Sequence, residues 1–243
     1  MLVGKTYWIV GASEGLGRAL AVELAQAGAM VIASARNAAR LDELCAETAN
    51  ITALPCDVTD TDAVARAAAR ASGADALIYC AGAYDPVSAT NWAADSVIKM
   101  AEVNYLGALR VLGAALPNLL ARKHGHIVLI GSLAGFRGLP GAIGYGSSKA
   151  ALMHLAENLR ADLAGNAIKV QCINPGFIET RLTAKNAFSM PQIMTAQTAA
   201  KQAIKAMEKG RFSTSFPAPF SWLFTFGRFL PLRIFQGFFQ TKP

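Results

Sequence analysis

The chain has 243 residues, 53% of them hydrophobic and 16% charged, which excludes a disordered chain and allows a large core without disulfides. Its four cysteines form no CxxC pair and its three histidines belong to no metal-binding motif, which favours free thiols and no metal site. The formal net charge is +7, but the basic residues are dispersed and not interleaved with aromatic residues, which disfavours nucleic-acid binding.

Short apolar segments alternate with helical patterns along the chain. The predicted strands are residues 7–10, 30–33, 51–54, 76–79, 126–130 and 168–173. The predicted helices are residues 16–24, 41–49, 63–71, 95–120 and 145–163. Strands that are apolar on both faces and separated by helices form a parallel sheet with helices on both sides. Right-handed crossovers then give a doubly wound α/β fold, and we expect a single domain over residues 1–243.

A glycine-rich turn, GASEGLG, joins the first predicted strand to the first helix. Gly11 permits a tight turn, Gly15 leaves space where a cofactor approaches, and Gly17 lets the helix pack closely on the strand. Backbone N–H groups at such a helix N-terminus can bind a pyrophosphate, although the G-x3-G-x-G spacing differs from the commoner dinucleotide pattern. The predicted cofactor contacts in this turn are Gly11, Ser13, Glu14, Gly15, Leu16 and Gly17.

The end of the second predicted strand indicates which dinucleotide is bound. A carboxylate there would hold the adenosine ribose of NAD, but none occurs before Asp42. Arg36 stands there instead and can make a bidentate contact with the 2′-phosphate of NADP, with Arg40 as a second contact. We therefore predict NADP as the cofactor, with NAD as the alternative if Arg36 simply faces solvent.

A tyrosine and a lysine form the candidate reacting centre. Tyr145 and Lys149 are four residues apart on one predicted helix, which places them on the same face. An ammonium near a phenol lowers the phenol pKa and suits it to proton transfer with an alcohol. Ser132 follows the fifth predicted strand, at the sheet edge where doubly wound folds bind ligands, and can hydrogen-bond a substrate carbonyl.

Between Thr6 and Thr180 these residues resemble the short-chain dehydrogenase/reductase family. The segments that match the family are the glycine turn, Asp57-Val58 at the adenine, Ala81-Gly82 after the fourth strand, and Pro175 to Thr180 over the nicotinamide, with Pro175, Gly176, Ile178 and Thr180 as contacts. Asn104, Ser132, Tyr145 and Lys149 match the catalytic tetrad. The chain departs from the family at Val10, Glu14, Tyr79 and Cys80, and Glu14 would repel a 2′-phosphate if it pointed toward one.

The resemblance implies a Rossmann-type domain that transfers hydride between a nicotinamide and a carbonyl or secondary alcohol. It implies that Tyr145 is the acid/base and that Lys149 holds the nicotinamide ribose and depresses the tyrosine pKa. Ser132 would orient the carbonyl, and Asn104 would hold a water that links Lys149 to solvent. The cofactor half would span about residues 1–100, the catalytic half about 101–180, and the substrate lid with a C-terminal extension about 181–243. A homodimer or homotetramer is expected for this family.

The composition changes from Arg211 onward. Nine of the twelve phenylalanines lie there with Trp222 and four basic residues, and there is no acidic residue. The apolar runs are too short to span a membrane. Three interpretations remain open, namely a substrate lid with subunit contacts, an interfacial element on anionic lipid, and core packing. Because no charged leader precedes the first strand, we expect a cytoplasmic protein, which the second interpretation would place at a membrane periphery.

The substrate pocket is expected to lie between residues 84–91, 136–143 and 181–193, which flank the reacting centre. The residues of these segments are on balance small and apolar, so the predicted substrate is a hydrophobic ketone or alcohol. The rival function is a regulatory module that binds the cofactor with little catalysis. A complete Asn104, Ser132, Tyr145 and Lys149 set argues against that rival, because a binder needs no tyrosine–lysine pair.

Overall fold

The computed structural model describes residues 2–186 and 188–239, and its centre is one parallel sheet. Seven strands follow the order β3-β2-β1-β4-β5-β6-β7, and every neighbouring pair is parallel. The strands are Thr6–Val10 (β1), Met30–Ser34 (β2), Ile51–Ala53 (β3), Ala76–Tyr79 (β4), Gly125–Ile130 (β5), Ile168–Pro175 (β6) and Ser213–Phe216 (β7). The strand order reverses between β1 and β4, where doubly wound sheets bind their ligands.

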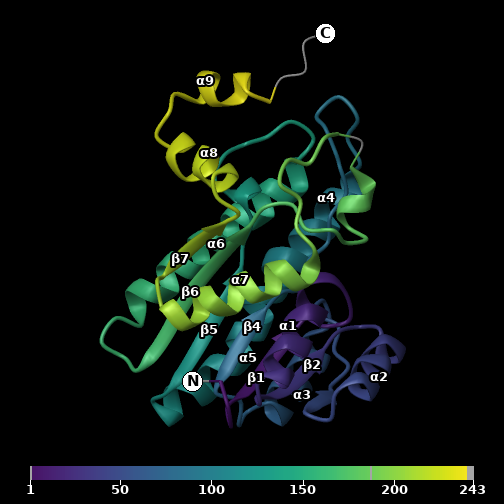
Figure 1. The fold of residues 1–243 in the computed structure, drawn as a ribbon, viewed down its shortest axis with the longest axis vertical. Coiled ribbons are helices and arrows are strands. Elements are labelled where there is room, and N and C mark those ends of the chain that lie inside the picture. The colour runs from purple at the N-terminus through teal and green to yellow at the C-terminus, as the bar shows by residue number, and fades with distance from the viewer. Residues whose placement is uncertain (1, 187, 240–243) are drawn as a thin grey trace.

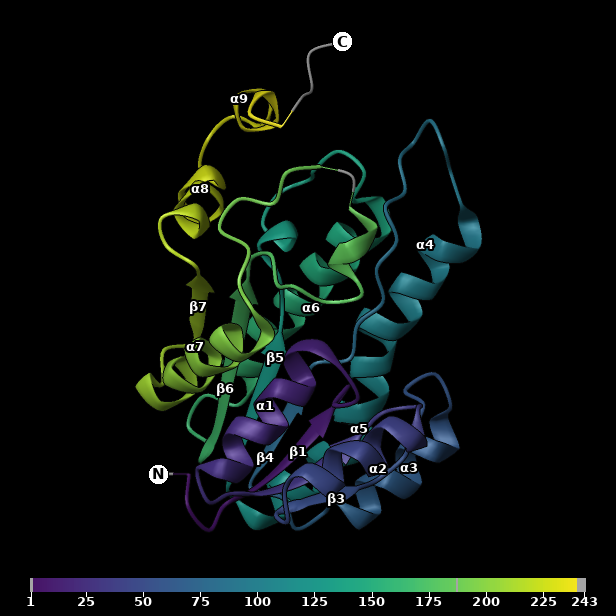
Figure 2. The same ribbon diagram turned by 45° about the vertical axis from the view of Figure 1, so that its right-hand side comes forward.

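Helices cover both faces of the sheet (Figures 1 and 2). One core forms under α1, α2 and α7, and the other forms under α3, α5 and α6. The helices are Gly15–Gln26 (α1), Ala38–Glu47 (α2), Thr61–Arg70 (α3), Ala94–Ala101 (α4), Gly107–Arg122 (α5), Ile143–Asp162 (α6), Ala196–Lys209 (α7), Phe220–Gly227 (α8) and Leu232–Gly237 (α9). This architecture confirms the predicted doubly wound, Rossmann-type α/β fold.

Alternation along β1 shows how one strand supplies both cores. Tyr7 and Ile9 point into the core under α1 and α7, whereas Trp8 and Val10 point into the opposite one. The Trp8 indole nitrogen donates a 2.9 Å hydrogen bond to the Ser34 hydroxyl on β2. A continuous apolar run therefore folds as a buried strand because both of its faces are covered.

The helical pattern over residues 95–120 is not one regular helix. It comprises α4, a π-helical turn η1 over Glu102–Leu106, and α5. The Gly107 N–H closes the π-turn on the Glu102 carbonyl. The structure also contains α7 and β7, which the sequence analysis did not predict.

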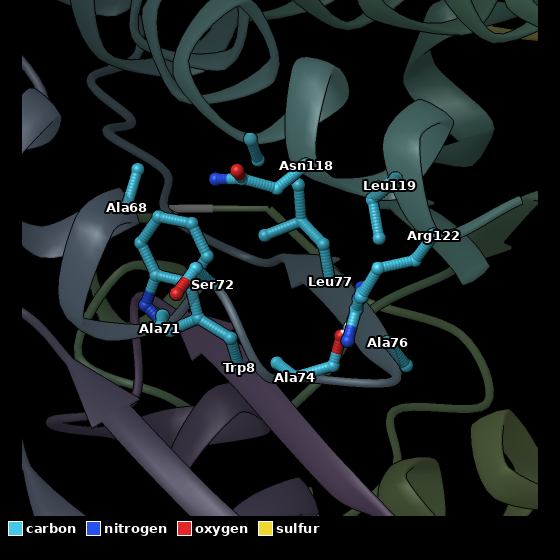
Figure 3. A pocket seen from close by; sticks show the side chains of 11 residues that line it. Trp8, Ala68, Ala71, Ser72, Ala74, Ala76, Leu77, Asn118, Leu119 and Arg122 are labelled. Carbon is cyan, nitrogen blue, oxygen red and sulfur yellow. Dashed lines mark hydrogen bonds between the residues drawn. The ribbon is translucent and has the colours of Figure 1, made fainter. Parts of the chain in front are cut away.

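A small gap between β1, α3 and α5 is a packing defect and not a ligand site. Its walls include Trp8, Ala68, Leu77, Asn118 and Arg122, whose side chains surround it in Figure 3. The volume is about 10 Å³, roughly the space of one water molecule. Within residues 2–186 and 188–239, none of the helices combines the length and apolar composition needed to cross a membrane.

Candidate active site

A large cavity lies at the carboxyl ends of the central strands. Its volume is about 1390 Å³, and it extends from the glycine turn to the C-terminal helices α8 and α9. The predicted site residues that line it are Gly11, Ser13, Glu14, Gly15, Leu16, Gly17, Arg36, Val58, Ala81, Gly82, Ser132, Tyr145, Lys149, Pro175, Gly176, Ile178 and Thr180. Asn104 and Asp57 lie outside its lining. The fold thus brings together residues that are far apart in the sequence.

The glycine turn is shaped by close backbone contacts. Gly11 has a φ of 100°, and a Cβ there would lie 2.4 Å from the Ala81 nitrogen. A Cβ on Gly17 would lie 2.0 Å from the Gly11 oxygen, so the first helix can approach the strand only without a side chain. Gly15, with a φ of 56°, faces Thr180, which a Cβ would approach to 2.9 Å. These contacts favour glycine at all three positions and place the loop after β6 close to the turn.

Glu14 links this turn to two arginines. It accepts hydrogen bonds from Arg40 on α2 and from Arg181 in the loop after β6, the latter at 2.7 and 3.0 Å. Hydrogen bonding to Arg181 is the largest cause that lowers the pKa of the Glu14 carboxyl. The carboxylate is thus paired with two cations.

Arg36 lies at the rim of the cavity, where β2 ends. Its guanidinium lies 3.9 Å from the Asp57 carboxylate, which also accepts hydrogen bonds from the Thr59 N–H and hydroxyl. Exposure and a loose ion pair leave Arg36 available to an incoming anion. Val58 is buried against Gly107, where a Cβ would lie 2.8 Å from its methyl carbon.

Tyr145 and Lys149 both line the cavity from the first turns of α6. The Lys149 ammonium is buried and donates a 2.8 Å hydrogen bond to the Ile130 carbonyl at the end of β5. Burial lowers the Lys149 pKa to about 8. Lys149 Nζ lies 5.9 Å from the centre of the Tyr145 ring.

The ionisation of Tyr145 differs from the sequence expectation. Burial raises its pKa, and a hydrogen bond with Ser132 opposes that rise only in part. The net direction is therefore opposite to the lowering expected from Lys149. The ring also packs edge-on against Tyr84, with centroids 5.1 Å apart. Tyr145 is therefore a protonated phenol at neutral pH.

Asn104 is fully buried behind the cavity, in the π-turn η1. Its side-chain amide accepts from the Ala83 N–H at 2.6 Å and donates to the Ala83 carbonyl and to Ser148 Oγ. A Cβ on Gly82 would lie 3.7 Å from Asn104 Oδ1 and 4.0 Å from Lys149 Nζ. The two side chains thus flank Gly82, and Asn104 fastens the segment after β4 to α6.

Aromatic residues from the C-terminal helices close the far end of the cavity. Phe220, Leu223 and Phe224 of α8 line it, as do Phe238 and Phe239 after α9. The Phe177 and Phe220 rings stack with centroids 5.7 Å apart. Residues from the three segments expected to flank the pocket also line this part, namely 84 and 86, 139–142, and several between 181 and 191.

The contact between Glu14 and Arg181 was not predicted from the sequence, because 167 residues separate the two and no motif joins them. Arg181 was expected only in a range flanking the substrate pocket. The roles of the five aromatic and aliphatic residues from α8 and α9 were likewise left open. Within the described part of the chain, no cluster of three or more His, Cys, Asp or Glu side chains is placed to hold a metal ion.

Comparison with known proteins identifies the family. A model of the short chain dehydrogenase family matches residues 5–190. An uncharacterized oxidoreductase of Myxococcus xanthus is 39% identical over 221 residues, which cover 88% of this chain and 87% of the relative. An uncharacterized oxidoreductase of Staphylococcus epidermidis is 33% identical over 84% of this chain and 90% of its own length.

Solved structures agree with this assignment. A short chain dehydrogenase of Burkholderia cenocepacia in complex with NADP has a TM-score of 0.89, with 26% identity over 100% of both chains. A short-chain dehydrogenase of Sphingobium yanoikuyae in complex with NADPH has a TM-score of 0.81, with 26% identity over 88% of this chain and 89% of that one. Together with the doubly wound sheet, these matches show that the chain belongs to the short-chain dehydrogenase/reductase family of nicotinamide-dependent oxidoreductases.

Proposed function

We propose that this protein is an NADP-dependent oxidoreductase that interconverts an apolar carbonyl compound and its secondary alcohol, with Tyr145 as the acid/base. The observation that carries the proposal is the convergence of Ser132, Tyr145 and Lys149 on the cavity that begins at the glycine turn. When bound there, the nicotinamide supplies or accepts the hydride. The Rossmann-type fold and the family membership support this chemistry.

Each residue of the reacting centre has a distinct task. A phenol is protonated at neutral pH, and burial raises the pKa of Tyr145 further, so Tyr145 can donate its proton to a carbonyl oxygen during reduction. Ser132 hydrogen-bonds Tyr145 and would also hydrogen-bond that oxygen, which would orient the substrate. Lys149, held by the Ile130 carbonyl, would hold the ribose hydroxyls. Asn104 is a positioning residue that keeps the Ala83 backbone against α6.

The choice of NADP over NAD rests on the cations beside the glycine turn. Arg36 and Arg40 both line the cavity where β2 ends, and a guanidinium binds a phosphate in a bidentate manner. Glu14 would repel a phosphate if it were unpaired, but its ion pairs with Arg40 and Arg181 offset its charge. Two structural neighbours that contain NADP or NADPH support the same choice.

The substrate and assembly proposals follow from apolar surfaces. Phe177, Phe188 and the α8 residues surround the space beyond Tyr145, which suits a hydrophobic ketone or alcohol. Ile98, Leu109 and Leu120 on α4 and α5 are exposed, which supports a homodimer or homotetramer through those helices.

Turnover of a substrate panel tests the function. Aliphatic and aromatic ketones would be offered with NADPH or NADH, and nicotinamide absorbance would be followed for wild type, Tyr145→Phe and Tyr84→Phe. Tyr145→Phe should lose at least about 10²-fold in kcat while its NADPH affinity stays within about twofold, because only the proton donor is removed. Tyr84→Phe removes a hydroxyl from the same cavity and should keep most of the turnover. Equal turnover by Tyr145→Phe would refute the acid/base role, and absence of turnover in wild type would favour a regulatory binding module.

A further inference from the structure

The last two helices form an arm at the end of the molecule. The α8–α9 arm, residues 220–239, follows β7 and lies beyond the carboxyl end of the sheet, away from the N-terminus (Figures 1 and 2). Arg137, in the loop before α6, donates hydrogen bonds to the Arg228 and Leu230 carbonyls. The arm is thus fixed to the body of the protein at the turn between its two helices.

The inner face of the arm is a small core. Phe224 and Phe235 are buried with Leu133, and a Cβ on Gly227 would lie 2.7 Å from the Phe235 ring. Neighbouring Leu223 and Phe239 line the substrate end of the large cavity. The inner face therefore provides the core packing and the substrate wall that the sequence analysis held open as separate interpretations.

The outer face of the arm is apolar and exposed. Its large side chains are between 46 and 73% exposed, namely Trp222, Phe226, Phe229, Leu232 and Ile234. So many large apolar side chains exposed within residues 220–239 are uncommon on a surface that meets only water, and they mark an interaction site. Aromatic rings of this kind favour the boundary between lipid headgroups and acyl chains.

The charges on the arm indicate its partner. Arg228 and Arg233 are exposed among these apolar side chains, and the sequence has no acidic residue after Glu208. A symmetric contact between two copies of this face would bring arginines together without a carboxylate to pair them. An anionic lipid surface offers both the apolar layer and the negative charge that the face lacks.

We propose that the outer face of the α8–α9 arm binds an anionic membrane surface, and that the apolar substrate reaches the cavity from that membrane. The second clause rests on the proposed function, because it assigns the cavity to a carbonyl or alcohol substrate. The same short arm carries both surfaces, so a bound membrane lies beside the wall formed by Leu223 and Phe239. A lipid-dissolved ketone or alcohol would then pass from the bilayer to Tyr145 with little exposure to water.

Vesicle flotation of the full chain tests the membrane contact. Wild type should float with vesicles of phosphatidylcholine and phosphatidylglycerol at low salt, bind phosphatidylcholine alone more weakly, and be released from the anionic vesicles by 0.5 M NaCl. The double variant Phe226→Ser/Phe229→Ser should bind at least about tenfold more weakly. Arg228→Gln and Arg233→Gln should each weaken binding about fivefold. Trp92→Ser, which changes a comparably exposed aromatic residue in the loop before α4, should bind like wild type.

Two further measurements keep the outcomes distinct. Turnover of a water-soluble ketone without vesicles should be the same in wild type and in the Phe226→Ser/Phe229→Ser variant, since neither residue lines the cavity. Analytical ultracentrifugation should give the same mass for both proteins. Equal flotation of wild type and the double variant would overturn the proposal. It would also be overturned if wild type did not bind the vesicles and the double variant had a lower mass than wild type, because this face would then be a subunit interface. Absent turnover with normal flotation would instead refute the proposed function and the substrate transfer that rests on it, and would leave the membrane contact supported.

Discussion

Burial has opposite effects on the two ionisable groups of the reacting centre. It raises the pKa of the Tyr145 phenol and lowers that of the Lys149 ammonium to about 8, because both charged forms lose water. The phenol is therefore held protonated, while the ammonium loses its proton within an accessible pH range. At mildly alkaline pH, Lys149 thus loses its charge while Tyr145 keeps its proton.

The Lys149 pKa predicts that kcat/KM for NADPH falls as the pH rises. The ammonium is present below about pH 8 and is lost as the pH rises through that value. The ratio kcat/KM for NADPH reports the free enzyme, so it should fall about tenfold per pH unit above pH 8. Lys149→Arg keeps a charge at all these pH values and should lack this decline, whatever its absolute rate. A wild-type profile that stays flat to pH 10 would contradict the assignment.

His126 on β5 makes the stability of the folded protein sensitive to acid. Burial, and then the charge of Lys169, lowers its pKa to about 4, and its Nε2 has no hydrogen-bond partner among the described residues. The unfolded chain binds this proton at about pH 6.5 and the folded chain only near pH 4, so stability falls as the pH falls between these values. Between pH 7 and 4.5 this effect lowers the unfolding free energy by about 2–3 kcal/mol.

Urea denaturation at the two pH values measures this effect. His126→Gln should lose less stability than wild type on acidification, because glutamine does not titrate. His124→Gln is the matched control, since His124 is exposed. This variant should lose as much stability as wild type on acidification. Parallel losses in wild type and His126→Gln would remove His126 from the acid response.

At the scale of elements, the sequence predicts best where large apolar residues are buried. The strands β1 to β6 were predicted to within one or two residues at most ends, because both of their faces are covered. The helix α7 was missed because its buried face is mainly alanine, which gives no contrast in size. The strand β7 reads Ser-Thr-Ser-Phe at the sheet edge and has no apolar run.

The candidate site shows the same limit. The glycine turn, Ser132, Tyr145 and Lys149 could be predicted because their spacing along one or two elements carries the signal. The pairing of Glu14 with Arg181 could not, because it depends on where the loop after β6 comes to rest. The phenol pKa was expected in the wrong direction, since sequence spacing places Lys149 near Tyr145 but does not report burial.

The Glu14–Arg181 pair connects two elements that border the cofactor cavity. Glu14→Gln removes the charge that holds the loop after β6, so backbone amides at residues 178–186 should exchange hydrogen about threefold to tenfold faster. The melting temperature should change by no more than about 2 °C, because the pair is partly exposed. Glu47→Gln breaks the pair with Arg18 and serves as the control, with exchange in that loop unchanged. Unchanged exchange in Glu14→Gln would show that the ion pair does not restrain the loop.

At the scale of the whole molecule, cofactor binding should appear as thermal stability. A ligand that binds the folded state raises the unfolding free energy by about 2.7 kcal/mol at one hundred times its Kd. Wild type should therefore gain more melting temperature from NADPH than from equimolar NADH, and Arg36→Asp should abolish or reverse that difference. Arg70→Asp makes the same charge change in the last turn of α3 and should keep the NADPH preference. An unaltered preference in Arg36→Asp would place the 2′-phosphate elsewhere.

The π-turn over Glu102–Leu106 has a consequence for the length of the chain. Each residue rotates an α-helix by about 100°, so the surplus residue of a π-turn offsets the faces of the two flanking helices. On one side α4 packs on α6, and on the other α5 packs on α3. Deleting one residue here would restore a regular helix but turn one of these faces away from its neighbour. One extra residue in this turn thus determines how the packing surface of α4 is rotated relative to that of α5. Asn104 lies in the turn between the two helices.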